Sequence, residues 1–182
     1  VIYEEAEPGN WIFVEHVMND AIPPIIEDID RDGEGELVTF DQSFFYAFDS
    51  YAASYSPIVI ERLRQGGFNN VTKTKSGRNR LKLQLDEMET SAENRPELWR
   101  SNGFLAAWVA LKSSLGEGND AWRKMLLLYD RNSSFGTYEC ADKSVKIYEC
   151  PAQKLILIPF PDALKRHLVK RGYWDKKIET PD

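Results

Sequence analysis

The stretch Ile26–Phe45, IEDIDRDGEGELVTFDQSFF, places seven acidic residues within twenty positions and then continues into an apolar, aromatic segment. Two glycines interrupt the acidic part. A solvated surface turn has this composition. A loop that holds a hard cation has it too, because carboxylate oxygens are the ligands that Ca²⁺ and Mg²⁺ prefer. The choice between these interpretations decides how the first third of the chain folds and what it does.

The composition of the chain is that of a globular protein. Its 182 residues are 42% hydrophobic and 29% charged, enough apolar material to bury a core. We predict a single domain over residues 1–182, with a helical part at about 1–67 and a mixed part at about 68–182. Apolar runs stay well below the ~20 residues of a membrane span. The net charge of -6 makes a nucleic-acid partner unfavourable.

Cys140 and Cys150 are too few for a disulfide framework or a four-ligand zinc site. On opposite arms of a hairpin they could form a disulfide in an oxidising compartment, whereas in a reducing cytosol they would stay free thiols. The sequence leaves both alternatives open. The chain begins at Val1 without a basic-then-apolar leader, although a processed chain would have lost one. The cytoplasm is slightly favoured.

Helices are predicted through the first third of the chain. Apolar residues recur with a 3.6-residue spacing in the first of them, and Asn10 is placed to cap it. Pro24 suits the first turn of the second helix, and Gly66 and Gly67 suit the end of the last. The predicted helical ranges are 11–21, 25–29, 40–54 and 57–65.

The hydrophobic period changes after residue 70. Residues 71–75 (VTKTK) and 80–85 (RLKLQL) alternate in polarity, and residues 76–79 have the composition of a turn. This pattern predicts a β-hairpin. Because side chains alternate along a strand, one face of the second strand would carry Leu81, Leu83 and Leu85, and the other Lys82 and Gln84.

The remaining patterns predict helices at 98–115, 121–129 and 162–170, and strands at 136–140, 144–150 and 154–160. Gly172 stands just beyond the last helix. The sequence therefore predicts an α+β fold, in which a helical N-terminal third with a helix–loop–helix precedes helices mixed with antiparallel β-hairpins.

Counted from Asp30, a twelve-residue segment has oxygen-bearing side chains at its first, third, fifth, seventh and last places. Gly35 holds the sixth place, where a backbone with φ > 0 would wrap the ligands, and Leu37 holds the eighth. Over about residues 24–48 this segment resembles the EF-hand calcium loop. The resemblance implies helices on both sides of the loop. It also implies a metal site formed by Asp30, Asp32, Glu34, Glu36 (through its carbonyl) and Asp41.

Three positions depart from the EF-hand pattern. Asp41 stands where the family usually has a glutamate, and its shorter arm favours six-coordinate geometry and a site more tolerant of magnesium. Glu34 is longer than the usual residue at the fifth place, and Val38 at the ninth has no side-chain oxygen. The implied cofactor is calcium or magnesium. A second such loop, from Asp130 through Asn132 and Ser134, is better interpreted as a polar turn, because its glycine comes one place late.

The other notable residues of the sequence do not predict a specific function. The two histidines, His16 and His167, lie far apart in sequence and have no metal-site spacing. Tyr173 and Trp174, near the end of the chain, are expected to pack on the core. A basic cluster on the predicted hairpin is expected to protect a sheet edge, with docking of an acidic partner as the alternative. Its members are Lys73, Lys75, Arg78, Arg80 and Lys82.

The sequence therefore predicts a domain that binds calcium or magnesium, structurally or as a sensor, and acts through contacts with a protein partner. The acidic loop carries this hypothesis. One alternative is an enzyme or enzyme subunit without a recognisable motif, and another is an acidic interaction domain without metal. No catalytic residue is proposed from the sequence.

Overall fold

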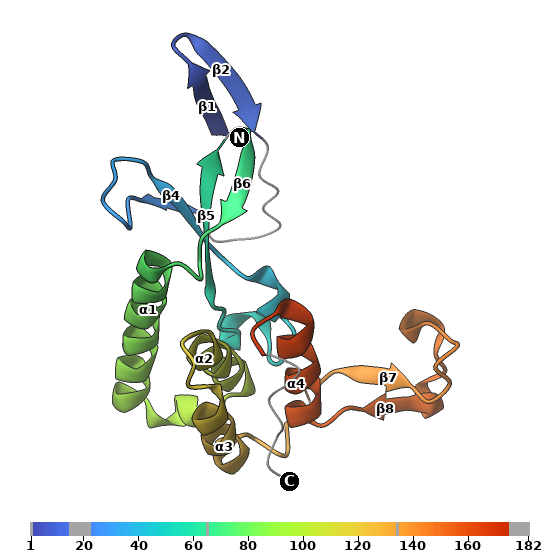
Figure 1. The fold of residues 1–182 in the computed structure, drawn as a ribbon. Helices are drawn as coiled ribbons and strands as arrows, with labels where there is room; N and C mark the ends of the chain where they lie inside the picture. Colours follow the sequence, from blue (N-terminus) through green and yellow to red (C-terminus); the bar gives the residue numbers. More distant parts are fainter. Residues whose placement is uncertain (1, 15–22, 65, 134, 175–182) are drawn as a thin grey trace.

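A four-stranded antiparallel sheet forms the first half of the body. The computed structural model describes residues 2–14, 23–64, 66–133 and 135–174. The sheet has the order β3-β4-β5-β6, so each strand pairs with the next one along the chain. The strands are β3 (Ile25–Glu27), β4 (Glu36–Phe40), β5 (Ile58–Arg64) and β6 (Gly67–Asn70). A separate hairpin of β1 (Ile2–Glu7) and β2 (Asn10–Val14) stands at one end of the molecule (Figure 1).

The second half of the body is helical. Helix α2 lies at its centre, in contact with the other three helices (Figure 1). Ten consecutive residues of α2, from Asn102 to Leu111, are buried, as expected for a helix that is covered on all sides. The α-helices are α1 (Lys75–Asn94), α2 (Asn102–Ser114), α3 (Gly118–Leu128) and α4 (Phe160–Arg171). Short 3₁₀ helices cover Gln42–Phe44, Tyr51–Ala53, Pro96–Arg100, Ile147–Glu149 and Ala152–Lys154.

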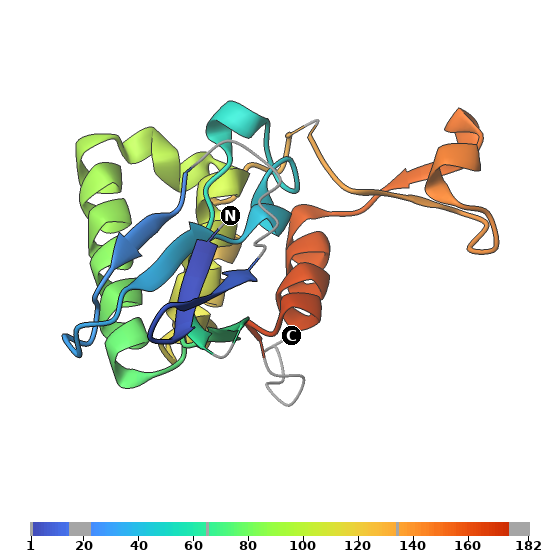
Figure 2. The ribbon, with the colours of Figure 1, turned by 90° about the horizontal axis from the view of Figure 1, so that it is seen from above.

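Between α3 and α4 the chain leaves the body. Strands β7 (Tyr138–Cys140) and β8 (Leu155–Leu157) pair with each other in an antiparallel ribbon. The ribbon and the loop beyond it extend away from the helices in both ribbon views, which Figure 2 shows clearly. We call residues 137–158 the arm.

The predicted helical N-terminal third is wrong. Residues 25–27 and 58–64 are strands, and the range 40–54 contains the end of β4 and two short 3₁₀ helices. Of the predicted helix 11–21, residues 11–14 belong to β2, and the remainder lies outside the described residues. The physical reason is the β-branched content of these segments, as in Ile58, Val59 and Ile60, which favours pleated strands over helix. The acidic segment therefore connects two strands, and the predicted helix–loop–helix does not form.

The predicted hairpin over residues 71–85 is also wrong, because α1 begins at Lys75. Thr74 caps this helix by accepting a hydrogen bond from the N–H of Gly77. The six residues of RLKLQL alternate, but over a longer window the buried residues follow the helical spacing. They are Leu81, Leu85, Met88 and Ala92. Leu83 is exposed, and the buried Gln84 binds the N–H of Ile58 and the carbonyl of Ser56.

The later predictions fare better. Helices predicted over 98–115, 121–129 and 162–170 are confirmed by α2, α3 and α4, and Gly172 ends α4 in the left-handed conformation. The strands predicted at 136–140 and 154–160 are confirmed in shorter form, whereas residues 144–150 form a loop with a 3₁₀ turn. The mixture of helices with antiparallel strands is as expected. No helix among the described residues is long and apolar enough to cross a membrane.

Candidate functional site

The acidic loop between β3 and β4 is folded by its own carboxylates. Asp28 accepts hydrogen bonds from the N–H groups of Asp32 (3.1 Å) and Gly33 (3.0 Å). Asp32 accepts one from the N–H of Glu34 (2.9 Å), and this bond is the largest cause that holds the pKa of Asp32 below its usual value. Left-handed backbone occurs at Arg31 and Gly33. The loop is thus an ordered turn, stabilised by hydrogen bonds from backbone N–H groups to carboxylates.

Arg62 on β5 lies at the centre of this charge. It faces Glu36 across the sheet, because these two residues are register partners on β4 and β5. Its Nε donates to Glu36 Oε1 (2.7 Å), and its two terminal nitrogens reach Asp30 (2.5 Å) and Asp32 (3.0 Å). The second oxygen of Glu36 accepts the N–H of Ile29 (3.0 Å). Hydrogen bonds to Glu36 and Asp30 raise the pKa of Arg62. One guanidinium therefore serves three carboxylates.

The structure separates the five predicted ligands into three groups. Asp30, Asp32 and Glu36 converge on Arg62. Glu34 points to Arg64 at 2.8 Å, and Asp41 lies in a different cluster described below. The side chain of Glu36 is fully buried and takes part, whereas the EF-hand resemblance implied its carbonyl. The calcium or magnesium site remains a prediction.

Two residues that matter in this loop were missed from the sequence. Asp28 has a carboxylate oxygen within 4.8 Å of oxygens of Asp30 and Glu36, so these three could hold a metal ion. Arg62 was missed because it lies 26 residues from Glu36. Gly35 does not have the positive φ expected of it. Glycine fits this position because β3 passes close by: a Cβ there would lie 2.5 Å from Cγ2 of Ile26.

Asp41 ties the C-terminal helix to the sheet. It caps the 3₁₀ turn at Gln42 by accepting the N–H (3.0 Å) and the hydroxyl (2.6 Å) of Ser43. It also accepts hydrogen bonds from Arg171 (2.8 Å) and from the Tyr173 hydroxyl (3.0 Å). Burial alone would raise the pKa of Asp41, but the bonds from Arg171 and Ser43 outweigh it and lower the pKa. Burial, with Asp41 nearby, raises the pKa of Tyr173.

Ser43, His167 and Asp41 form a hydrogen-bonded chain but not a catalytic triad. In a triad the imidazole lies between the hydroxyl and the carboxylate. Here the hydroxyl lies between the other two, because Ser43 donates its proton to Asp41 and contacts Nε2 of His167 at 3.1 Å. The imidazole also packs edge-on against Phe44 and Phe48. Burial, the largest cause, lowers the pKa of His167. The cluster is suited to holding α4 in place. His16 lies outside the described residues.

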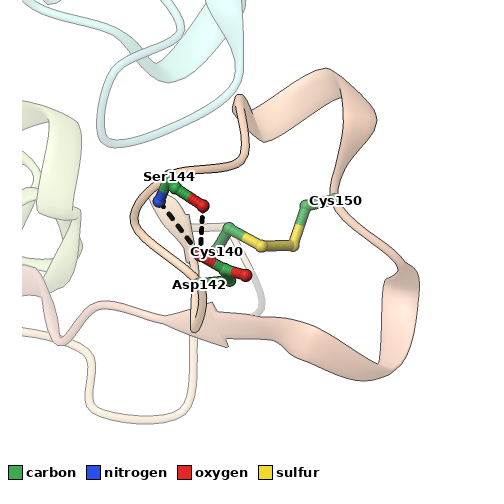
Figure 3. Close-up of a disulfide and its surroundings, with 4 residues drawn as sticks. All are labelled: Cys140, Asp142, Ser144 and Cys150. Carbon is green, nitrogen blue, oxygen red and sulfur yellow. Dashed lines mark hydrogen bonds between the residues drawn. A yellow bond between two sulfur atoms is a disulfide. The ribbon is translucent and has the colours of Figure 1, made fainter.

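The arm contains the disulfide. Cys140 at the end of β7 is bonded to Cys150, which closes a loop with a sequence separation of 10 (Figure 3). Inside this loop Asp142 accepts the N–H (3.1 Å) and the hydroxyl (2.6 Å) of Ser144, and these bonds lower its pKa. The sequence left the pairing of the two cysteines open. The structure resolves it as a bridge.

The arm also exposes apolar side chains. All three residues of β8 are solvent-accessible: Leu155 is 37% exposed, Ile156 52% and Leu157 44%. By register Tyr138 of β7 lies opposite Leu157, and it is exposed as well. In the loop beyond the strands Ile147 and Tyr148 are exposed. None of these residues has the cover that apolar strand residues normally find.

The basic residues at the start of α1 are not on a strand edge, so the sheet-protecting role predicted for them is wrong. Arg80 binds Glu27 of β3 at 3.0 Å and links the helix to the acidic loop. Tyr173 and Trp174 pack on the core, as predicted. Asp130 and Asn132 lie in a turn after α3, where Asp130 accepts the N–H of Asn132, as the polar-turn interpretation predicts. Ser134 lies outside the described residues.

The segment that contains the helical core and the arm matches a known family. The sll0997 C-terminal domain family matches residues 78–172, from the first turn of α1 to the end of α4, and the chain belongs to this family. The matched segment includes the arm but not the acidic loop.

Two longer bacterial proteins are similar to the chain. The uncharacterized protein y4bJ of Sinorhizobium fredii is 38% identical over 93% of this chain. The probable thylakoid lumen protein sll0997 of Synechocystis is 35% identical over 87%. The matches cover 27% and 46% of these relatives, so the chain spans less than half of either. No solved structure shows significant similarity to the chain.

Proposed function

We propose that this chain is a protein-binding domain and that the arm is its binding element. The partner is a protein that presents an apolar surface to the arm. Charge does not define the partner, because the acidic and basic residues of the arm balance. They are Glu139, Asp142, Lys143, Lys146, Glu149 and Lys154.

The exposure of β8 carries this proposal. A strand that is apolar on both faces is typical of a sheet covered on both sides. In β8, Leu155 and Leu157 point to one face and Ile156 to the other, yet all three are exposed. An isolated two-stranded ribbon is marginally stable in water, and the Cys140–Cys150 bond holds this one in shape. A preformed apolar ribbon of this kind binds with little loss of conformational entropy.

The compartment is proposed from the same bond. Disulfides form and persist in oxidising environments and are rare in the cytosol. The relative named as a probable thylakoid lumen protein carries a name that places it outside the cytoplasm. We therefore propose an oxidising compartment for this chain, in place of the cytoplasm that the sequence slightly favoured.

Site-specific photo-crosslinking in the native host tests the proposal. A photoreactive p-benzoylphenylalanine placed at Ile156 is expected to give a discrete protein adduct. The matched control is the same group at Leu127 on α3, which is 84% exposed but lies on the helical body. The variant Ile156→Asp should abolish the adduct formed from a second probe at Tyr148. Equal adducts from Ile156 and Leu127, or none from the arm, would refute the proposal.

Divalent-cation binding at the acidic loop is a second candidate function. One observation favours it: oxygens of Asp28, Asp30 and Glu36 all lie within 4.8 Å of one another. Hard cations bind oxygen ligands in such clusters. The ion and Arg62 compete for the same oxygens, since Arg62 already binds Asp30 and Glu36. Cation binding therefore requires the guanidinium to move aside.

Calcium titration by calorimetry, with magnesium competition, tests this second function. A saturable heat that disappears in Asp28→Asn combined with Asp30→Asn supports it. The matched control is Asp120→Asn, an exposed aspartate of α3, which should leave the heat unchanged. Absence of heat in the parent at millimolar calcium would exclude the cation function and leave the protein-binding proposal untouched.

A further inference from the structure

The disulfide lies in the arm and outside the core. Neither cysteine belongs to the hydrophobic core cluster of the described residues. The loop that the bond closes, residues 141–149, is exposed at every position except the partly buried Val145. Figure 3 shows the bond joining the end of β7 to the far side of this loop. Breaking the bond therefore changes the arm and leaves the packing of the body as it is.

The ribbon itself is short. Strands β7 and β8 pair over three residues each. Beside them, Ala141 donates its N–H to the carbonyl of Lys154 (2.8 Å) and Ile158 donates to that of Thr137 (2.9 Å). A two-stranded ribbon of this kind is at best marginally stable in water. The oxidation state of the two sulfurs therefore decides how much of the time the ribbon is ordered.

The bond lies at the surface of the molecule. Cys150 is partly exposed and stands between the exposed residues Glu149 and Pro151. Cys140 is 8% exposed, and it lines a cavity of about 400 Å³ to which both the arm and α4 contribute. Exposed disulfides are the labile and regulatory ones, whereas structural bonds resist reduction. A reductant in solution therefore approaches this bond through Cys150.

The charges beside Cys140 favour its release as a thiolate. Lys143 and Arg166 line the same cavity. Glu139 lines it as well, and its carboxylate is paired with Arg166. A nearby cation favours a thiolate over a thiol, and the more stable thiolate is the faster leaving group.

We propose that the Cys140–Cys150 bond is a redox switch of the arm, opened by a dithiol reductant. The proposal rests on the arm as the protein-binding element. With the bond closed, the apolar ribbon is preformed for its partner. With the bond open, the ribbon loosens and the partner is released.

The switch operates by thiol–disulfide exchange. A thiolate of the reductant attacks Sγ of Cys150 and forms a mixed disulfide, while Cys140 leaves as a thiolate and takes up a proton. The second thiol of the reductant loses its proton and attacks the first sulfur of the reductant, which releases Cys150. Two electrons and two protons thus pass from the dithiol to the bridge. The same exchange in reverse, with a disulfide as the oxidant, closes the bond again.

Reduction of the purified domain by dithiothreitol tests the switch without a partner. Free thiols are counted over time in native buffer and in denaturing urea. The native rate is expected to lie within about tenfold of the unfolded rate, because the bond is at the surface. After reduction, amides of β7 and β8 should exchange about a hundredfold faster, while those of α2 stay protected. A bond that opens only on unfolding, or an arm that stays protected after reduction, overturns the proposal.

Photo-crosslinking from Ile156 in the native host then connects the switch to binding. In a variant that combines Cys140→Ser with Cys150→Ser, the adduct of the oxidised parent is expected to fall by at least about tenfold. No reductant reaches the partner in this comparison. The matched control is Ser144→Ala, which changes the same loop, keeps the bond and should keep the adduct.

An undiminished adduct in the double variant overturns the proposal. Absence of any adduct from the parent refutes the protein-binding function instead, and the reduction and exchange measurements still decide whether the bond controls the order of the arm.

Discussion

The acidic loop joins β3 to β4, and the arm consists of β7, β8 and the loop between them. The side chains of the acidic loop are paired inside the domain, whereas the apolar side chains of the arm are exposed. In the loop the carboxylates find partners within the domain: Asp30, Asp32 and Glu36 at Arg62, and Glu34 at Arg64. In the arm the apolar side chains of β8 stay 37–52% exposed. A dense cluster of charge is therefore weak evidence for a ligand when the next strand supplies the opposite charge. Exposed apolar residues on a ribbon held by a disulfide are stronger evidence for a partner.

The largest effect is expected at the centre of the acidic loop. Arg62→Met removes the cation that serves the fully buried Glu36. An unpaired buried charge destabilises a fold by about 3–5 kcal/mol. Urea unfolding measures the loss. The matched variant, Arg64→Met, breaks an exposed pair with Glu34 and should lower stability by about 0–1 kcal/mol. Equal losses in both variants would show that Arg62 is not the centre of the loop.

The disulfide should matter next, and only in the arm. Replacing Cys140 and Cys150 by serine opens a loop with a sequence separation of 10. Chain-entropy arguments assign such a loop about 2–3 kcal/mol. Amide hydrogen exchange in β7 and β8 is expected to accelerate by about a hundredfold. The buried amides of α2 serve as the control and should keep their protection. Faster exchange throughout α2 would mean that the arm supports the core.

The Asp41 cluster should make the stability of the fold depend on pH, because it contains His167. The pKa of His167 lies below the ordinary 6.5, mainly because burial disfavours the imidazolium. Folding therefore favours the neutral ring, so the stability it contributes is present above pH 6.5 and is lost as the pH falls toward the lower folded value. Urea midpoints should be lower at pH 5.5 than at pH 7.5, each pH chosen as about one unit from the reference pKa.

His167→Gln should flatten this dependence. Carboxylates such as Asp41, whose pKa is lowered, affect stability only at more acidic pH. A slope that is unchanged in His167→Gln would assign the pH dependence to another group.

The smallest effect on stability is expected in the arm itself. Ile156→Ser replaces a side chain that is 52% exposed, so the free energy of unfolding should change by no more than about 0.5 kcal/mol. The contrasting variant is Ile60→Ala in β5, where the side chain is fully buried and truncation costs about 2–5 kcal/mol. A large loss from Ile156→Ser would show that the arm is covered by the rest of the chain.

How far the sequence predicts this molecule depends on the length of each pattern. The apolar run in α2 is long, from Phe104 to Leu111, and its helix is confirmed. The alternation over residues 80–85 is too short to oppose the helical period that continues to Ala92. The segment at Ile25 and Ile26 had too few residues for any period, and there tertiary pairing with β4 decides the structure.

The candidate sites were predictable only in part. The acidic residues of the loop stand out in the sequence, but Arg62 reaches them through strand register, which a local pattern does not contain. Asp41 appeared to close the same loop, yet its partners Arg171 and Tyr173 lie 130 and 132 residues further along the chain. The apolar run in β8 was visible as a strand. Its exposure is a property of the fold.

Side-chain footprinting of the protein in its native compartment tests the central contrast most directly. Hydroxyl radicals label exposed side chains, and the labelled fraction is compared between the protein in the cell and the purified domain. We predict that Tyr148 and Ile156 lose labelling in the cell, while Leu127 and Ile26, both exposed on the body, keep it. Protection at Ile26, beside the acidic loop, with an arm as accessible as in the purified domain would contradict the account.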